Sequence, residues 1–449
     1  MESVKENKMA SVPVLKLIIS MSVPSMFSML IQALYNIVDS MYVSFYSIDA
    51  LTAVSLAFPI QMLMISVAVG TGVGINSLVS RRLGEKRFDD ANSAATHGAV
   101  LAVASWVLFV ILGLLFIEPY FSMMNASEPV RQMSCTYTNI AIYLSFGCFI
   151  QCVFEKTLQA TGNMIYPMLF QLTGAVINII LDPIFIFGYL GAPEMGIAGA
   201  AYATVIGQIA AAIFAVIIIF TKTHDVHISF KGFKLNFKII GEIYAVGFPA
   251  IIMQAIGSVL TTALNKILIG FSEAAVTVYG IYFKLQSFVF MPVFGLNQGV
   301  MPIMGYSYGA RNKKRLISTL KYGCIIAFSI MLIGTVLFWA FPNQMLMMFN
   351  ANDEIIRIGV PALRIISLCF TSAAIGIMFS TLFQAVGIGI NSLIISLLRQ
   401  IVVLLPAAYL LSLIGLEAVW YAFPIAEGIS LIASIVMFRF VYRKHIKNL

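Results

Sequence analysis

Apolar runs of about 20 residues recur from one end of the chain to the other, separated by short polar stretches. A run of this length crosses the roughly 30 Å hydrocarbon core of a bilayer as an α-helix. Lipid cannot bond to backbone amides, so only helices and closed barrels can span it. Barrel strands alternate in polarity over about ten residues, whereas residues 205–220 are apolar except for Gln208. The pattern therefore predicts helices.

The polar breaks divide the chain into twelve predicted spans, so the expected fold is an all-α polytopic membrane protein. Their ends are defined to within several residues. They cover roughly 14–45, 50–80, 94–116, 134–158, 163–190, 196–220, 239–270, 276–306, 318–340, 358–385, 391–413 and 416–440.

Composition and charge support this prediction. Only 10% of the residues are charged, against about 25% in soluble domains, so most of the surface must face lipid. The net charge of +8 does not indicate nucleic acid, because the basic residues gather at alternate connections. That distribution follows the positive-inside rule and predicts a protein of the cell membrane with both termini in the cytoplasm.

Much of the two halves of the chain repeats at one offset, the one that superposes Pro24 on Pro249, and farther on the register slips, so that Gly196 is best matched by Gly415. Four further pairs agree with it: Gly70 and Gly295, Gly74 and Gly299, Gly84 and Gly309, Gly162 and Gly387. Each repeat holds six spans, so both enter the membrane from the same side, and a substrate site is expected at their interface. We predict two pseudo-symmetric six-helix bundles, residues 1–220 and 239–449, joined by a cytoplasmic linker at 221–238.

Two carboxylates lie inside predicted spans, where ionisable groups usually have a function. Asp39 in the first span and Asp182 in the fifth lie at similar depth, and Asn178 shares a helix face with Asp182. Carboxylate and amide oxygens suit Na⁺, and buried carboxyl groups also hold protons. These residues are therefore predicted to form a site for a coupling ion, Na⁺ or H⁺. The alternative is a purely structural role in their own bundle.

Other charged residues within spans are weaker candidates for a substrate cavity. Glu155 lies beside Lys156 and either contacts substrate or forms an interfacial pair. Glu427 either attracts a cationic substrate or pairs with Arg399. Lys284 lies in the outer part of the eighth span, where its role is open.

Two features of the spans bear on transport. Pro24 and Pro249 occupy equivalent places in the repeat, where they act either as hinges of alternating access or as static kinks. The chain also holds 34 Phe, 24 Met and 18 Tyr residues. Such side chains allow a cavity to accept varied amphipathic ligands and organic cations.

Taken together, these features make the chain resemble the multidrug and toxic compound extrusion (MATE) transporters, in their bacterial MepA-like/DinF-like branch. The resemblance covers nearly the whole chain. It is carried by the stretch from Pro24 to Tyr42, and by the segments at 70–74, 83–86, 158–162 and 178–183.

The resemblance implies export of cationic or amphipathic compounds against entry of Na⁺ or H⁺, through a central cavity between the bundles. It also implies a cation site at Asp39, Asn178 and Asp182, with Thr204 as the nearest match to a participating threonine. Some relatives carry essential carboxylates in the seventh and eighth spans. Those spans have Lys266 and Lys284 here, so coupling is expected in the N-terminal bundle.

Three other functions agree less well with the sequence. A flippase for lipid-linked precursors is the runner-up, but few cationic residues lie within the spans to hold a pyrophosphate. A major-facilitator antiporter fits the repeat less well. An enzyme is least expected, because the sequence has no Walker loop, no HExxH and no protease motif. We expect a monomer in the lipid bilayer that uses no cofactor besides the coupling ion and whose partners are small organic cations or amphipathic drugs.

Overall fold

The computed structural model describes residues 7–124, 126–349 and 351–449, and this part of the chain contains helices and no strand. The first six residues of the predicted N-terminal bundle therefore lie outside it. The helices up to the predicted linker are α1 (Lys8–Ser11), α2 (Val14–Tyr46), α3 (Ile48–Gly84), α4 (Phe88–Ser122), α5 (Glu128–Tyr143), α6 (Phe146–Ala160), α7 (Ile165–Phe187), η1 (Tyr189–Gly191) and α8 (Ile197–Thr221).

The remaining helices include more short and broken elements. They are α9 (Phe237–Ile269), α10 (Glu273–Gly309), α11 (Lys313–Ala340), α12 (Pro342–Met347), α13 (Asp353–Ser367), α14 (Phe370–Ala385), α15 (Gly389–Leu397), the π-helix η2 (Leu398–Leu404), α16 (Leu405–Ser412), α17 (Leu416–Trp420), α18 (Ala422–Val441) and the π-helix η3 (Tyr442–Ile446).

The predicted all-α membrane fold is confirmed. Ten helices are long and apolar enough to cross a bilayer, and two bent pairs raise the number of spans to as many as twelve among the described residues. The bent pairs are the fourth and tenth predicted spans, each of which the sequence pattern treats as one continuous helix. In the structure α5 and α6 meet at 46°, and α13 and α14 meet at 45°.

The repeat is visible in the backbone as well as in the sequence. The two bends fall at matching places in the two halves, and the equivalent glycines Gly162 and Gly387 both have φ of 87°. Only glycine adopts such a conformation without strain. Ser47 and Ser272 are another equivalent pair, because each accepts a hydrogen bond from the backbone three residues later, at 2.9 and 3.1 Å. The same turn chemistry therefore shapes both halves.

The chain packs as two compact units whose borders differ from the predicted bundles. One unit is Phe27–Ile251, and the other combines the residues up to Met26 with Ile252–Leu449. Thus α2 and α9 each divide between the units, at borders that are equivalent in the repeat. Pro24 and Pro249 lie just before these borders, inside helices that continue past them. Their predicted role as hinges stays a prediction.

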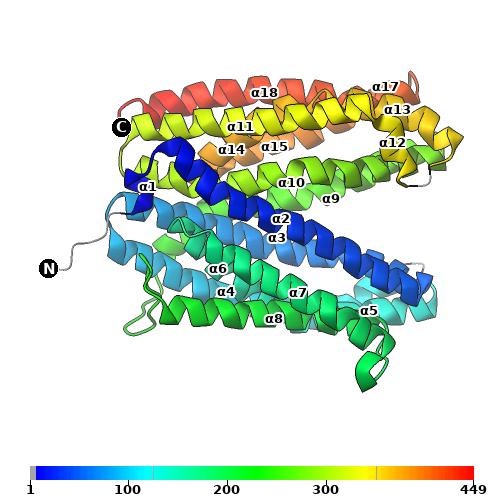
Figure 1. Cartoon of the computed structure of the whole chain (residues 1–449), viewed down its shortest axis with the longest axis horizontal. Helices are drawn as coiled ribbons and strands as arrows, with labels where there is room; N and C mark the ends of the chain where they lie inside the picture. Colours follow the sequence, from blue (N-terminus) through cyan, green and yellow to red (C-terminus); the bar gives the residue numbers. More distant parts are fainter. Residues whose placement is uncertain (1–6, 125, 350) are drawn as a thin grey trace. The chain divides into compact units, whose positions relative to one another are not determined.

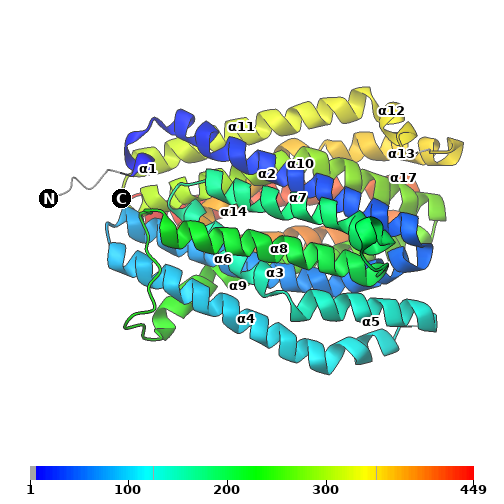
Figure 2. The same cartoon turned by 60° about the horizontal axis from the view of Figure 1, so that its bottom comes forward.

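Within the unit Phe27–Ile251, neighbouring helices lie side by side, as α7 and α8 do in both views (Figures 1 and 2). The buried side of α8 consists mainly of glycine and alanine, which lets the backbones approach closely. The outward sides carry large apolar residues, including Leu108 and Leu115 of α4, which are more than half exposed. Such surfaces suit lipid rather than water.

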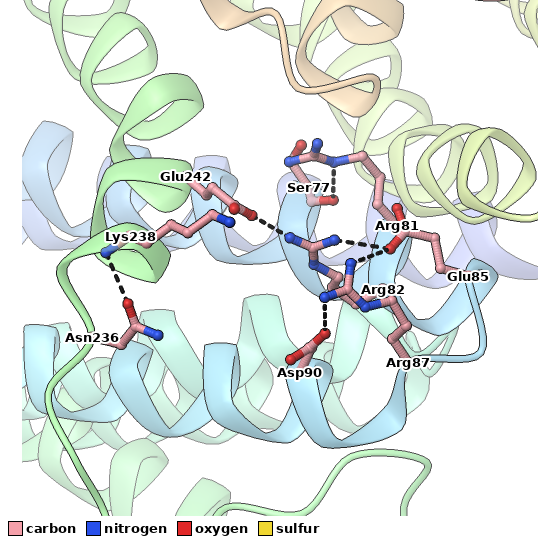
Figure 3. A network of polar contacts seen from close by, with 9 residues as sticks. All are labelled: Ser77, Arg81, Arg82, Glu85, Arg87, Asp90, Asn236, Lys238 and Glu242. Carbon is pink, nitrogen blue, oxygen red and sulfur yellow. Dashed lines mark hydrogen bonds and ion pairs between the residues drawn. The ribbon is translucent and has the colours of Figure 1, made fainter.

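At one end of this unit, charged side chains join three helices (Figure 3). Arg82, near the end of α3, donates to Glu85 at 2.9 Å and to Glu242 of α9 at 2.6 Å. Arg87 then pairs with Glu85 at 3.4 Å and with Asp90 of α4. These contacts hold the first turns of α9 against α3.

Candidate ion-binding site

The two predicted intramembrane aspartates meet in the unit Phe27–Ile251. Asp39 comes from the second part of α2 and Asp182 from α7, and their carboxyl groups are close enough to share a hydrogen bond. Asp182 is fully buried, and one oxygen of Asp39 is buried without a hydrogen-bond partner in the described part of the chain. A carboxyl group donates a hydrogen bond only when it is protonated. A hydrogen bond between the two carboxyl groups therefore requires a proton on one of them.

Asn178 extends this pair toward α8. It precedes Asp182 by one helical turn, and its amide lies 3.3 Å from an Asp182 oxygen and 3.2 Å from the Thr204 hydroxyl. In this orientation the amide nitrogen donates to both partners; with the amide swapped, the nitrogen donates to Asp182 at 3.3 Å and the oxygen accepts from the Thr204 hydroxyl and backbone amide, both at 3.2 Å. The structure therefore brings together all four residues that the sequence analysis named for ion coupling. Their role in coupling stays a prediction.

Two tyrosines and a glutamine that were not predicted from the sequence also belong to this cluster. Tyr35 and Tyr137 both lie within range of the charges of Asp39 and Asp182. The Tyr137 hydroxyl accepts a hydrogen bond from Gln61 at 3.2 Å. Tyr35 precedes Asp39 by four residues, so helical spacing could have revealed it. Tyr137 comes from α5, and no local pattern connects it with the aspartates.

The chemistry of this cluster is that of an oxygen-lined site. Carboxylate, amide and hydroxyl oxygens are the ligands that hard cations prefer. No group of three or more His, Cys, Asp or Glu side chains that would hold a transition metal occurs among residues 7–124, 126–349 and 351–449. Sodium or a proton therefore fits the cluster better than zinc or a related metal.

Glu155 lies in the same unit but in a different environment. It pairs with Lys156, with 3.7 Å between Glu155 Oε1 and Lys156 Nζ, and both side chains are more than 90% buried. Gln159 and Gln171 donate to the Glu155 carboxylate at 3.0 and 3.1 Å. The predicted pair with Lys156 is present, and it lies in the interior of the unit. The carboxylate accepts from protein donors here, and contact with substrate, the other alternative, stays a prediction.

The other weak candidates belong to the second unit. Arg399 and Glu427 form an ion pair with 3.1 Å between Nη1 and Oε1, so the predicted pairing is present. Lys284 is exposed, and its Nζ lies 5.8 Å from the centre of the Phe349 ring. Lys284 therefore reaches toward the loop that follows α12.

Comparison with known proteins identifies the family to which this arrangement belongs. The MatE family model matches the chain twice, at residues 24–184 and 249–410. The two matches begin at Pro24 and Pro249, so they are separated by the offset of the internal repeat. Together the matches cover well over half of the chain.

Individual relatives agree with this assignment. The multidrug export protein MepA of Staphylococcus aureus is 25% identical over 427 residues, which are 95% of this chain and 93% of the relative. The solved outward-facing conformation of a multidrug resistance MATE family transporter of the MOP superfamily is 28% identical. It has a TM-score of 0.94 and covers 100% of both chains.

A third relative indicates that a shared fold does not establish a shared substrate. This MOP superfamily transporter from Pyrococcus furiosus is 28% identical, with a TM-score of 0.92 over 98% of each chain. It is described as having a binding pocket of reverse polarity that suggests a different function. Both family matches and the shared fold lead to one conclusion: this multi-pass membrane protein belongs to the MatE family of transporters.

Proposed function

We propose that the protein exports cationic or amphipathic compounds from the cell by antiport against inward movement of H⁺ or Na⁺. The observation that carries this proposal is the meeting of Asp39 and Asp182 in the interior of one unit, with Asn178 and Thr204 beside them. Isolated carboxylates are costly to bury in a membrane. Binding a proton or Na⁺ removes that cost, so occupancy of the site changes which conformation is stable.

The relatives support the substrate class. MepA is named a multidrug export protein, and the outward-facing structure is that of a multidrug resistance transporter. The coupling rests on linkage, because an ion that binds one conformation more tightly shifts the equilibrium by that difference in affinity. Inward movement of the ion then drives outward movement of the compound.

We further propose that the protein works as a monomer in the cell membrane, with both termini in the cytoplasm. The alternate placement of basic residues supports this orientation. A cofactor is not part of the proposal, since H⁺ or Na⁺ acts as a transported substrate rather than as a resident group.

The test is efflux of a fluorescent organic cation from vesicles that contain the purified protein, under an imposed H⁺ or Na⁺ gradient. Asp39→Asn should abolish gradient-driven efflux, because an amide cannot alternate between charged and neutral forms. Asp49→Asn is the matched control, since Asp49 is an exposed carboxylate near the start of α3.

Efflux that responds to one gradient and is lost only in Asp39→Asn would support the proposal and identify the ion. Absence of efflux under both gradients, from protein shown to be folded, would contradict it. That outcome would instead favour the alternative function, a flippase for lipid-linked precursors.

A further inference from the structure

The ion pair of Arg399 and Glu427 stands apart from the proposed coupling site, because it lies in the other compact unit. The residues equivalent to Arg399 and Glu427 in the other half of the repeat carry no charge. The offset that joins Pro24 with Pro249 places Gly174 opposite Arg399. The last span follows the shorter offset that joins Gly196 with Gly415, which places Gln208 opposite Glu427. Only one half of the molecule therefore has this pair, so the fold does not require it.

Glu427 faces the interior of its unit. The exposed side of α18 carries Ile425, Ile429, Ile432 and Val436, which recur with helical spacing. Glu427 is two residues from both Ile425 and Ile429, a little over half a helical turn, and therefore points away from this stripe. Its side chain is 15% exposed. The Glu427 side chain is therefore directed away from lipid but remains partly exposed.

Arg399 approaches Glu427 from a distorted helix. It is the second residue of the π-helix η2, which precedes Pro406. Proline has no amide hydrogen and its ring clashes with the carbonyl four residues earlier, so the preceding turn widens. Arg399 meets Glu427 through one nitrogen–oxygen contact of 3.1 Å and remains 30% exposed. Arg–carboxylate pairs are frequently bidentate, with two parallel contacts, and this pair has one.

Aromatic rings lie on the same side of α18 as Glu427. Phe423 precedes Glu427 by four residues on α18, so the two side chains share a helix face. The Phe423 ring centre lies 6.2 Å from that of Tyr279 and 6.0 Å from that of Tyr282, both on α10. Tyr282 also lies within range of the charge of Glu427. Aromatic faces beside a carboxylate are the surroundings that an organic cation prefers.

We propose that Glu427, Tyr279, Tyr282 and Phe423 form a binding site for an organic monocation with an aromatic or apolar body. In the structure, the Arg399 guanidinium occupies the place at Glu427 that the charge of the ligand would take. This inference deepens the proposed function, since it rests on the protein handling cationic compounds and names the residues that recognise their charge.

Such an arrangement allows the cation of a ligand to replace the Arg399 guanidinium at Glu427. Leaving a buried carboxylate unpaired is strongly unfavourable, so Glu427 keeps a cationic partner throughout. A ligand cation that displaces Arg399 restores the pair and adds contacts with the rings, while the long arginine side chain moves toward its exposed side. A neutral or anionic ligand of the same shape cannot replace the guanidinium. The site therefore selects for positive charge.

The experiment measures equilibrium binding of tetraphenylphosphonium to the purified full-length protein, without any ion gradient. Tetraphenylborate, which has nearly the same size and shape and the opposite charge, is the control ligand. The variants are Glu427→Gln, Arg399→Gln and the double variant, with Glu417→Gln as matched control because Glu417 is exposed on α17.

Glu427→Gln should weaken tetraphenylphosphonium binding about tenfold or more, the equivalent of one lost charge contact of about 1.4 kcal/mol. Arg399→Gln should strengthen it, because the internal competitor is gone. Glu417→Gln should leave it unchanged. If Glu427→Gln destabilises the protein by leaving Arg399 unpaired, the double variant removes both charges and should fold while binding the cation weakly.

Three results would overturn the inference. They are cation binding within twofold of the unmodified protein in Glu427→Gln, equal loss of tetraphenylborate binding in that variant, and weaker rather than stronger cation binding in Arg399→Gln. Each would mean that the pair only holds structure. Binding that depends on Glu427 without gradient-driven efflux would contradict the proposed antiport alone, whereas gradient-driven efflux that ignores Glu427 would contradict this site alone.

Discussion

Replacing Glu155 and Lys156, singly and together, tests how the structure keeps two charges inside a membrane-embedded unit. Their side chains are more than 90% buried and lie 3.7 Å apart. Gln159 connects them, since it accepts from Lys156 and donates to Glu155, both at 3.0 Å. Gly72 provides the necessary space, because a Cβ atom there would lie 2.6 Å from Cγ of Lys156.

The expected magnitudes follow from burial. Lys156→Met leaves the Glu155 carboxylate without its cation, and breaking a buried pair costs about 3–5 kcal/mol. We expect a value near the lower limit, about 3 kcal/mol, because Gln159 and Gln171 still donate to the carboxylate. Glu155→Gln should cost a similar amount, since it leaves the ammonium group unpaired. The double variant removes both charges with little change of volume and should lie within about 1 kcal/mol of the unmodified protein.

The measurement is the free energy of unfolding in mixed micelles titrated with SDS, followed by far-ultraviolet circular dichroism. The reasoning predicts strong non-additivity, with the double variant more stable than either single one. It would be refuted if Lys156→Met alone cost less than about 0.5 kcal/mol, or if the two single costs simply added. Efflux measured on the stable double variant then shows whether transport needs this pair at all.

Three further predictions concern other parts of the molecule. Asp182→Asn should abolish gradient-driven efflux while leaving the amount of protein in the membrane unchanged, and full efflux in that variant would exclude Asp182 from coupling. Glu242→Gln should lower the free energy of unfolding by about 1–2 kcal/mol, because Arg82 keeps Glu85 as a partner but loses its link to α9; no change in SDS unfolding would show that the link is dispensable. Cysteines placed at Lys231 and Lys314 should react with an impermeant thiol reagent only from the cytoplasmic side, and labelling from outside would overturn the proposed orientation.

The helical spans are the part of the fold that local sequence predicts well. Each apolar run must satisfy its own backbone hydrogen bonds in lipid, so its length and composition suffice to predict a helix. The bend between α5 and α6 was not predicted, because an apolar run has the same composition whether its helix is straight or broken. Ser145, two residues after the end of α5, donates to the Ile142 carbonyl at 2.7 Å and is fully buried, and this burial is decided only by the packing of the folded chain.

The candidate sites show a similar division. Asp39 and Asp182 were identified because charge is rare within apolar runs, and Asn178 because it lies one turn from Asp182. Tyr137 and Gln61 were missed, since they come together through the packing of α5 against α3, which no local pattern predicts. The aromatic cluster around Glu427 was missed likewise, because Tyr279 and Tyr282 come from a helix much earlier in the chain.

The sequence by itself determined the class of fold, the apolar segments that can span a membrane and the internal repeat, because membrane burial and repeated turns act through neighbouring residues. Tertiary structure alone decided which charges are paired, where α2 and α9 divide between the units, and which rings border Glu427. These features depend on contacts between distant segments, and the free energy of such contacts is set by packing and burial rather than by local pattern.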